Sequence, residues 1–207
     1  MHVVFDLDGV LLDSESDLSW LEDALSATLQ SVGLEDTADN RSALFPTTRE
    51  RLETLAEAAG VSTHHLWEVR NRQYTESKVA AIESGTIGPY EDIEAVDDLA
   101  AAYDLGIISN SPQSIVETFV AHVDMDGVFR PMVGRGTALE DIERMKPHTH
   151  LFERLHEQTT TDQYVYVGDQ ETDREFAERT GMDFICLDRE DGPMWSLYDV
   201  RDRILGH

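Results

Sequence analysis

The chain has 207 residues, enough for one ordinary domain or for one domain with a modest insertion. Its 16 basic and 42 acidic residues give a net charge of −26, so we expect no binding to nucleic acid or to anionic membranes. The acidic residues are spread along the whole chain, which is typical of cytoplasmic proteins from organisms that accumulate salt. We therefore expect a halophilic, cytoplasmic protein that is a monomer or a weak dimer.

Short apolar runs alternate with helical patterns over most of the chain. The expected strands are Val3–Phe5, Leu105–Ile108, Pro131–Val133, Tyr164–Val167 and Phe184–Leu187. The expected helices are Glu91–Tyr103, Pro112–His122, Thr149–Glu157, Glu171–Thr180 and Trp195–Leu205. Strands that alternate with helices predict an α/β fold, with a three-layer Rossmann-like core around a parallel sheet.

Residues 14–88 break this alternation, because they contain helical patterns and no strand-like run. Leucines 18, 21, 25 and 29 recur near helical spacing, and similar repeats follow further along. We predict a small α-helical cap at 14–88, inserted into a discontinuous core formed by 1–13 and 89–207. The small residues of Gly85–Pro89 suit a hinge where the chain returns to the core.

Two aspartates directly follow the first expected strand. Asp6 and Asp8 lie on the same side of an extended backbone, and Gly9 then lets the chain turn away. The carboxyl ends of strands are where open α/β sheets bind ligands. One carboxylate could act as a nucleophile while the other handles protons. That division of labour predicts phosphoryl transfer through an aspartyl-phosphate.

Small polar residues follow the next expected strand, and two interpretations of them remain open. Ser111 as the N-cap, with Pro112 at the first helical position, is ordinary helix-start chemistry. Alternatively, the Ser109 hydroxyl contacts a bound phosphate with the Asn110 amide beside it.

Lys146 is one of only two lysines in the chain, and it precedes a proline that fixes the local backbone. A lone lysine is ordinarily a solvated surface charge. A compact ammonium can also balance a carboxylate nucleophile and a phosphate together.

Asp169 and Asp173 stand where the expected strand Tyr164–Val167 leads into a helix. They could simply cap that helix and interact with its positive end. As a hard oxygen ligand, Asp169 also suits Mg²⁺, with Asp173 orienting the metal's surroundings. Together with Asp6 and Asp8 they would crowd negative charge onto one sheet edge, which is costly without a dication and a lysine. The sequence therefore predicts a Mg²⁺ site.

The four clusters resemble the four motifs of the haloacid dehalogenase superfamily, and more closely those of its phosphatase branch. The matching segments are Asp6–Val10, Ser109–Asn110, Lys146–Pro147, and Gly168–Asp169 with Asp173. The start of the chain is most similar to phosphoglycolate phosphatases and β-phosphoglucomutases. The helical insert lies where the subfamily with a small α-helical cap carries it.

The resemblance implies a role for each matching residue. Asp6 attacks the phosphorus, and Asp8 protonates the leaving oxygen and then activates water. Ser109 and Lys146 bind the transferring group. The Asp6 carboxylate, the Asp8 carbonyl and Asp169 hold Mg²⁺. Gln170 departs from the family pattern, where a small hydroxyl residue is common, as do His148 and His150.

The expected function is Mg²⁺-dependent hydrolysis of a small phosphorylated metabolite, and three alternatives remain. A β-phosphoglucomutase-like isomerase uses the same motifs. A dehalogenase needs neither a metal nor the proton donor Asp8. A catalytically idle binding protein could keep the fold.

Cap residues supply specificity in this architecture, and the candidate contacts are Arg49, Arg51, Arg70, Arg72 and Lys78. An arginine fork suits a carboxylate-bearing substrate, and Arg49 is the preferred contact because it follows a break in the helical pattern at Phe45–Thr48. The alternative is that these arginines are solvated on a helical cap.

Overall fold

A computed structural model describes residues 1–189 and 192–206, and its contacts divide the chain into two units. The first, here called the sheet unit, comprises Met1–Ser16, Ile87–Arg135 and Arg144–His207. The second, the helical unit, comprises Asp17–Thr86 and Gly136–Glu143. The boundaries predicted from sequence assign residues 14–16, 87–88 and 136–143 to the opposite unit.

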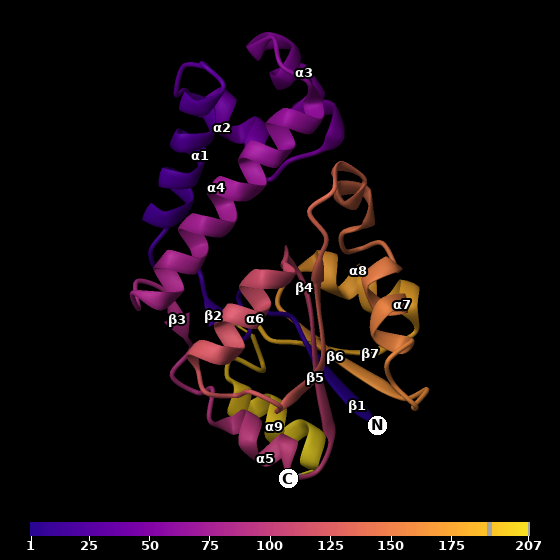
Figure 1. Cartoon of the computed structure of the whole chain (residues 1–207). Coiled ribbons are helices and arrows are strands. Elements are labelled where there is room, and N and C mark those ends of the chain that lie inside the picture. Colours follow the sequence, from indigo (N-terminus) through magenta and orange to yellow (C-terminus); the bar gives the residue numbers. More distant parts are fainter. Residues whose placement is uncertain (190–191, 207) are drawn as a thin grey trace. The chain divides into compact units, whose positions relative to one another are not determined.

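The sheet unit is built on a parallel sheet, which confirms the predicted α/β class. Among the described residues its strands run in the order β5-β4-β1-β6-β7 (Figure 1). Their bounds are His2–Phe5 for β1, Asp104–Pro112 for β4, Phe129–Arg135 for β5, Tyr164–Gly168 for β6 and Asp183–Cys186 for β7. The central strand β1 is fully buried between β4 and β6, so it reads as a continuous apolar run.

Helices cover both faces of this sheet. They are α5 (Ala95–Ala100), α6 (Gln113–His122), α7 (His150–His156), α8 (Glu171–Thr180) and α9 (Leu197–Leu205). The chain moves from β1 to β4 and β5 in one direction and to β6 and β7 in the other. Right-handed crossovers therefore place α5 and α6 on one face, and α7 and α8 on the opposite face. The helix predicted at Glu91–Tyr103 is shorter than expected, because turns precede Ala95 and follow Ala100.

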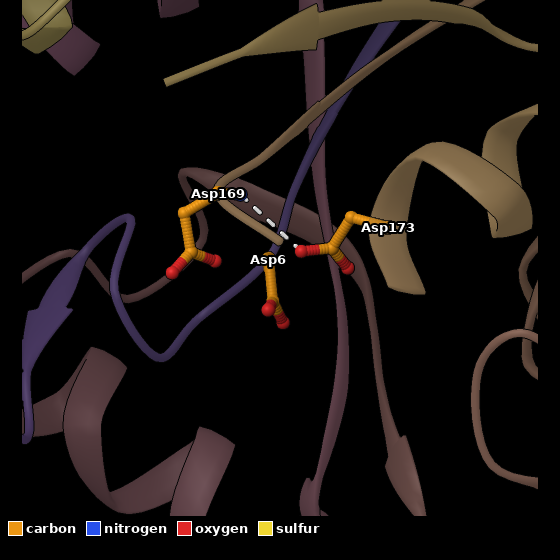
Figure 2. A group of neighbouring side chains, drawn as sticks. All are labelled: Asp6, Asp169 and Asp173. Atoms are coloured by element: carbon orange, nitrogen blue, oxygen red, sulfur yellow. Dashed lines mark hydrogen bonds between the residues drawn. The ribbon is translucent and has the colours of Figure 1, made fainter. Parts of the chain in front are cut away.

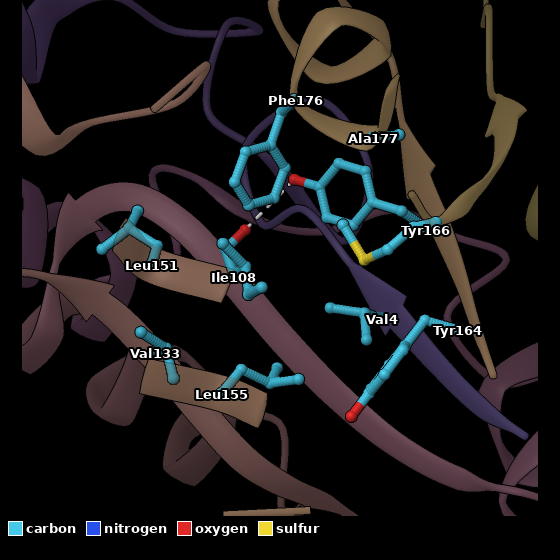
Figure 3. Packing of buried hydrophobic residues seen from close by; sticks show 10 residues of the cluster. Val4, Ile108, Val133, Leu151, Leu155, Tyr164, Tyr166, Phe176 and Ala177 are labelled. Carbon is cyan, nitrogen blue, oxygen red and sulfur yellow. Dashed lines mark hydrogen bonds between the residues drawn. The ribbon is translucent and has the colours of Figure 1, made fainter. Parts of the chain in front are cut away.

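The packing against α7 and α8 shows how the alternating pattern of the strands creates a core. Val4, Ile108 and Tyr166 point from three neighbouring strands toward Leu155 of α7 and Phe176 of α8 (Figure 3). The rings of Tyr166 and Phe176 meet edge to face with centroids 5.3 Å apart. This packing fixes the end of β6, where the polar residues of the site begin.

The helical unit contains α1 (Ser19–Ser31), α2 (Ala38–Leu44), α3 (Arg49–Ala59) and α4 (Thr63–Glu83). The side chains of Thr37, Thr48 and Ser62 cap the last three by accepting backbone N–H bonds. Trp67 of α4 donates to the Ala138 carbonyl at 3.0 Å, which binds the segment Gly136–Glu143 to this unit.

A short antiparallel pair in the sheet unit, β2 (Leu12–Asp13) and β3 (Gly88–Pro89), joins the segments that precede Asp17 and follow Thr86. Within the described residues, none of the helices has the length and apolar character needed to span a lipid bilayer.

Candidate active site

The carboxyl ends of the three central strands bring the predicted residues together. Asp6 follows β1, and its backbone N–H donates to the Val167 carbonyl of β6 at 2.8 Å. Asp169 follows β6, and Ser109 lies near the end of β4. Since β4 and β6 flank β1, residues far apart in the sequence meet at this edge.

Lys146 is the centre of the hydrogen-bond network at this edge. Its ammonium donates to Asp173 Oδ1 at 2.7 Å and to the Tyr166 hydroxyl at 2.8 Å, and it forms an ion pair with Asp6 Oδ1 at 2.8 Å. The lysine is only 6% exposed, so these protein oxygens replace the water that an exposed ammonium would bind. It therefore differs from a solvated surface lysine, and its charge is directed at the predicted nucleophile.

Burial and neighbouring charges both shift the pKa values of this network. Burial alone would lower the pKa of Lys146, but Asp6 and Asp173 outweigh that effect and raise it. Burial raises the pKa of Asp6 well above its usual range, and Asp173 adds to the effect while Lys146 opposes it. Burial, and then the charge of Asp173, raise the pKa of Asp169 to about 7. One ammonium is therefore not enough to neutralise the negative charge of these carboxylates.

The surroundings of Asp169 fit a divalent cation. Oxygens of Asp6, Asp169 and Asp173 lie within 4.8 Å of one another (Figure 2). Among the side chains that the structure describes, Asp169 Oδ1 is buried with no hydrogen-bond partner. Gly9, with φ of 78°, lies against the same carboxylate, and a Cβ there would be 2.2 Å from Asp169 Oδ2. Unpaired carboxylate oxygens in a space kept open by glycine are suitable ligands for a hard cation.

Asp173 has a positioning role in the structure. Its Oδ2 accepts the backbone N–H groups of Asp169 and Gln170 at 3.3 and 3.2 Å, while Oδ1 binds Lys146. The N-cap of α8 is Gln170, so the simpler interpretation in which Asp169 caps this helix is wrong. The Asp169 carboxylate is left available at the sheet edge.

Asp8 is held by a residue that the sequence suggested only as a helix cap. The Ser111 hydroxyl donates to Asp8 Oδ2 at 2.8 Å. Strand β4 continues through Pro112, which is itself the N-cap of α6, so the predicted start of this helix at Pro112 is wrong by one residue. The extended backbone of β4 directs Ser111 toward the loop that carries Asp8.

Ser109 and Asn110 lie at the same edge in different environments. Ser109 is buried, and its Oγ accepts the Ser111 N–H at 3.0 Å. The Asn110 side chain makes two bonds with the Lys146 backbone, accepting its N–H at 2.8 Å and donating to its carbonyl at 3.3 Å. These bonds position Lys146, and the substrate contacts of Ser109 and Asn110 stay predictions.

Arg49 belongs to the helical unit, where it forms an ion pair with Glu143 at 2.8 Å. Its expected contact with substrate also stays a prediction.

Sequence reasoning missed Tyr166 as part of the site. Its hydroxyl accepts from Lys146 and lies 3.1 Å from Asp173 Oδ1, so it bridges the ammonium and the carboxylate. The tyrosine stands in the apolar run of β6, where it reads as core. The sequence did offer one signal, because this residue places a hydroxyl on a buried strand two residues before Gly168.

The parallel sheet and its edge of buried carboxylates around a lysine define an α/β enzyme with a carboxylate-based site. The family profile described as haloacid dehalogenase-like hydrolase matches residues 3–187. The chain belongs to this family, and it is a hydrolase.

Individual relatives agree with this assignment. The chain is 26% identical over 181 residues to the phosphoglycolate phosphatase of Aquifex aeolicus, covering 86% of this chain and 80% of the relative. A crystal structure provisionally assigned as a phosphoglycolate phosphatase, from Lactobacillus delbrueckii, has a TM-score of 0.67 at 21% identity, covering 100% of this chain and 98% of the other. One provisionally assigned as a β-phosphoglucomutase, from Thermotoga maritima, has a TM-score of 0.64 at 18% identity, covering 99% and 98%. The two structures show a shared fold.

Proposed function

We propose that this hydrolase is a Mg²⁺-dependent phosphatase, which cleaves a small organic phosphomonoester through a phosphoryl group carried on Asp6. The observation that carries the proposal is the buried contact of 2.8 Å between Lys146 Nζ and Asp6 Oδ1, next to the unpaired oxygen of Asp169. A carboxylate nucleophile needs a cation beside it to approach a negatively charged phosphoryl group. The similarity to a phosphoglycolate phosphatase supports this substrate class.

The residues at the sheet edge account for both halves of the reaction. A carboxylate oxygen of Asp6 attacks phosphorus as the bond to the leaving oxygen breaks, and Asp8 gives that oxygen a proton. Water then attacks the phosphorus of the aspartyl-phosphate while Asp8 takes a proton from it, which releases phosphate. The bond from Ser111 orients the Asp8 carboxyl for these proton transfers.

The same residues suit the metal and the phosphoryl group. Mg²⁺ bound by Asp6, the Asp8 carbonyl and Asp169 would neutralise charge on the transferring group. Lys146 supplies a second positive charge, and Ser109 a hydroxyl, for the phosphoryl oxygens. Asp173 and Asn110 hold Lys146 in place from its side chain and its backbone, respectively.

The test is phosphate release from a panel of small phosphomonoesters in molar KCl, with MgCl₂ or with EDTA. We expect turnover that requires Mg²⁺ and that falls on the order of 10³-fold or more in Asp6→Asn. Glu117→Gln, on the exposed surface of α6, is a matched acid-to-amide control that should retain activity. Wild-type turnover that persists in EDTA, or in Asp6→Asn, would contradict the proposal.

The panel also separates hydrolysis from isomerisation. β-Glucose 1-phosphate converted to glucose 6-phosphate without phosphate release would identify a mutase instead. Arg49 is the proposed contact for the rest of the substrate. Arg49→Ala should therefore raise KM more than it lowers kcat, and an unchanged KM would remove it from the site.

A further inference from the structure

Arg189 lies outside every motif of the sequence, on the segment that follows β7. Its guanidinium donates hydrogen bonds to two backbone carbonyls and to one carboxylate. The Nε donates to the Gly9 carbonyl at 3.3 Å, and Nη2 donates to the Val10 carbonyl at 2.7 Å. The other edge binds both oxygens of Asp92, at 3.1 and 3.3 Å.

The groups around Arg189 hold the guanidinium in one orientation. Its plane lies over the Tyr90 ring, with the central carbon 3.5 Å from the ring centroid. Asp92 is only 8% exposed, and it also accepts the backbone N–H of Leu197, the first residue of α9, at 2.7 Å. A planar fork with fixed donors, stacked on a ring and paired with a buried carboxylate, loses little freedom when it binds the two carbonyls.

The two carbonyls belong to the turn that directly follows Asp8. Gly9 adopts a positive φ of 78° and lies against the Asp169 carboxylate, as described above. A shift of this turn would move the Asp8 backbone and change the space beside Asp169. The turn therefore sets the position of Asp8 relative to Asp169.

We infer that Arg189 is a positioning residue for the active site, which holds the Gly9–Val10 turn so that Asp8 and Asp169 keep the spacing needed for Mg²⁺ and catalysis. The inference rests on the proposed function, since it concerns the same site. It requires no contact between Arg189 and the substrate. Tyr90 and Asp92 hold the guanidinium, and the guanidinium holds the turn.

The matched control is Arg201, another arginine of the sheet unit. It lies over the Tyr198 ring at 5.1 Å and pairs with Asp98 at 3.1 Å. Both arginines thus stack on a tyrosine and pair with an aspartate, but Arg201 joins α9 to Asp98 of α5 and pairs with its own neighbour Asp202. Replacement of either arginine by methionine removes one stacked, paired guanidinium, and only one of the two replacements removes the bonds to the turn.

The experiment compares wild type, Arg189→Met and Arg201→Met by titration calorimetry with MgCl₂ and by steady-state phosphate release. We expect Arg189→Met to weaken Mg²⁺ binding by about 10–100-fold, as loss of groups that orient metal ligands does, and to lower kcat with little change in KM. Arg201→Met should stay within about twofold of wild type in both.

Results that overturn the inference alone differ from results that also overturn the proposed function. Folded Arg189→Met that binds Mg²⁺ and turns over like wild type overturns the inference alone. Wild type that binds no Mg²⁺ overturns the proposed metal dependence as well. If Arg189→Met does not fold, Arg189→Lys decides, because an ammonium cannot span two carbonyls and a carboxylate in a plane. Wild-type Mg²⁺ affinity in Arg189→Lys would then contradict the inference.

Discussion

Buried cations occur in both units, and their surroundings differ. Lys146 of the sheet unit is paired with two carboxylates and donates to a tyrosine hydroxyl. Arg70 of the helical unit is just as buried, at 5% exposure, but it lies among rings. Its guanidinium is 4.4 Å from the Tyr74 centroid and 5.4 Å from that of Trp67, and it donates to the Leu44 carbonyl at 3.3 Å.

The comparison separates a cation paired with carboxylates from one packed among aromatic rings. Burial lowers the pKa of Arg70, and no carboxylate in the described part of the chain opposes this effect. Carboxylates raise the pKa of Lys146 despite its burial. The sheet edge holds more negative than positive charge and suits additional cations, whereas Arg70 links the end of α2 to α4 through neutral groups.

Replacing Lys146 should give the largest change in stability. Lys146→Met leaves Asp6 and Asp173 buried without their ammonium, so we expect a loss of about 3–5 kcal/mol in the free energy of unfolding at pH 8. Urea denaturation in EDTA measures it. The double variant Lys146→Met, Asp6→Asn should recover part of the loss, because one of the uncompensated carboxylates is then removed. A loss below about 1 kcal/mol would show that the network is not a source of stability.

The same replacement at Arg70 should have a smaller effect. Arg70→Met loses interactions with rings and one carbonyl, but it also removes the cost of burying a charge and leaves no ion unpaired. We expect a loss of about 0–2 kcal/mol by the same denaturation measurement. A loss as large as that of Lys146→Met would end the distinction between the two cations.

The raised pKa of Asp169 predicts how Mg²⁺ binding depends on pH. With a folded-state value of about 7 against an ordinary 3.8, the metal-free fold takes up a proton here, and this contribution to stability is lost as pH rises from about 4 through 7. Mg²⁺ must displace that proton, so its affinity should be about tenfold weaker at pH 6 than at pH 8. Calorimetry at the two pH values tests this, and equal affinities would contradict it.

Salt should screen the exposed charges and should not change the difference in stability between the Lys146 and Arg70 variants. Because the chain has a net charge of −26, its acidic groups repel one another more strongly when salt is removed. We therefore expect the melting temperature to fall as KCl is diluted from molar to millimolar concentrations. Lys146→Met and Arg70→Met should show the same slope as wild type, because neither cation is accessible to ions. A flat melting temperature in wild type would argue against salt adaptation.

The sequence was sufficient to predict the fold and the motif residues of the site, but not the residues that hold them in place. Strand-end aspartates, a serine and a lysine on an alternating α/β pattern were sufficient to predict a parallel sheet with charged groups at one edge. The partners were not predictable, because Tyr166 reads as core and Ser111 as a helix cap. Arg189 reads as part of a charged stretch, and only the folded chain brings it to Gly9, 180 positions earlier. Such contacts depend on tertiary packing and leave no local pattern.

The most direct test of the central claim is to look for the phosphoryl group on Asp6. Asp8→Asn should slow the second half of the reaction, because no base remains to activate water. The first half can still proceed with an aryl phosphate, whose phenolate leaves without a proton from Asp8. The protein is incubated with MgCl₂ and an aryl phosphate, quenched in acid and mapped by mass spectrometry. We predict one added phosphoryl group on the peptide that contains Asp6. Turnover with no such group in Asp8→Asn or wild type, or the group on another residue, would contradict the account.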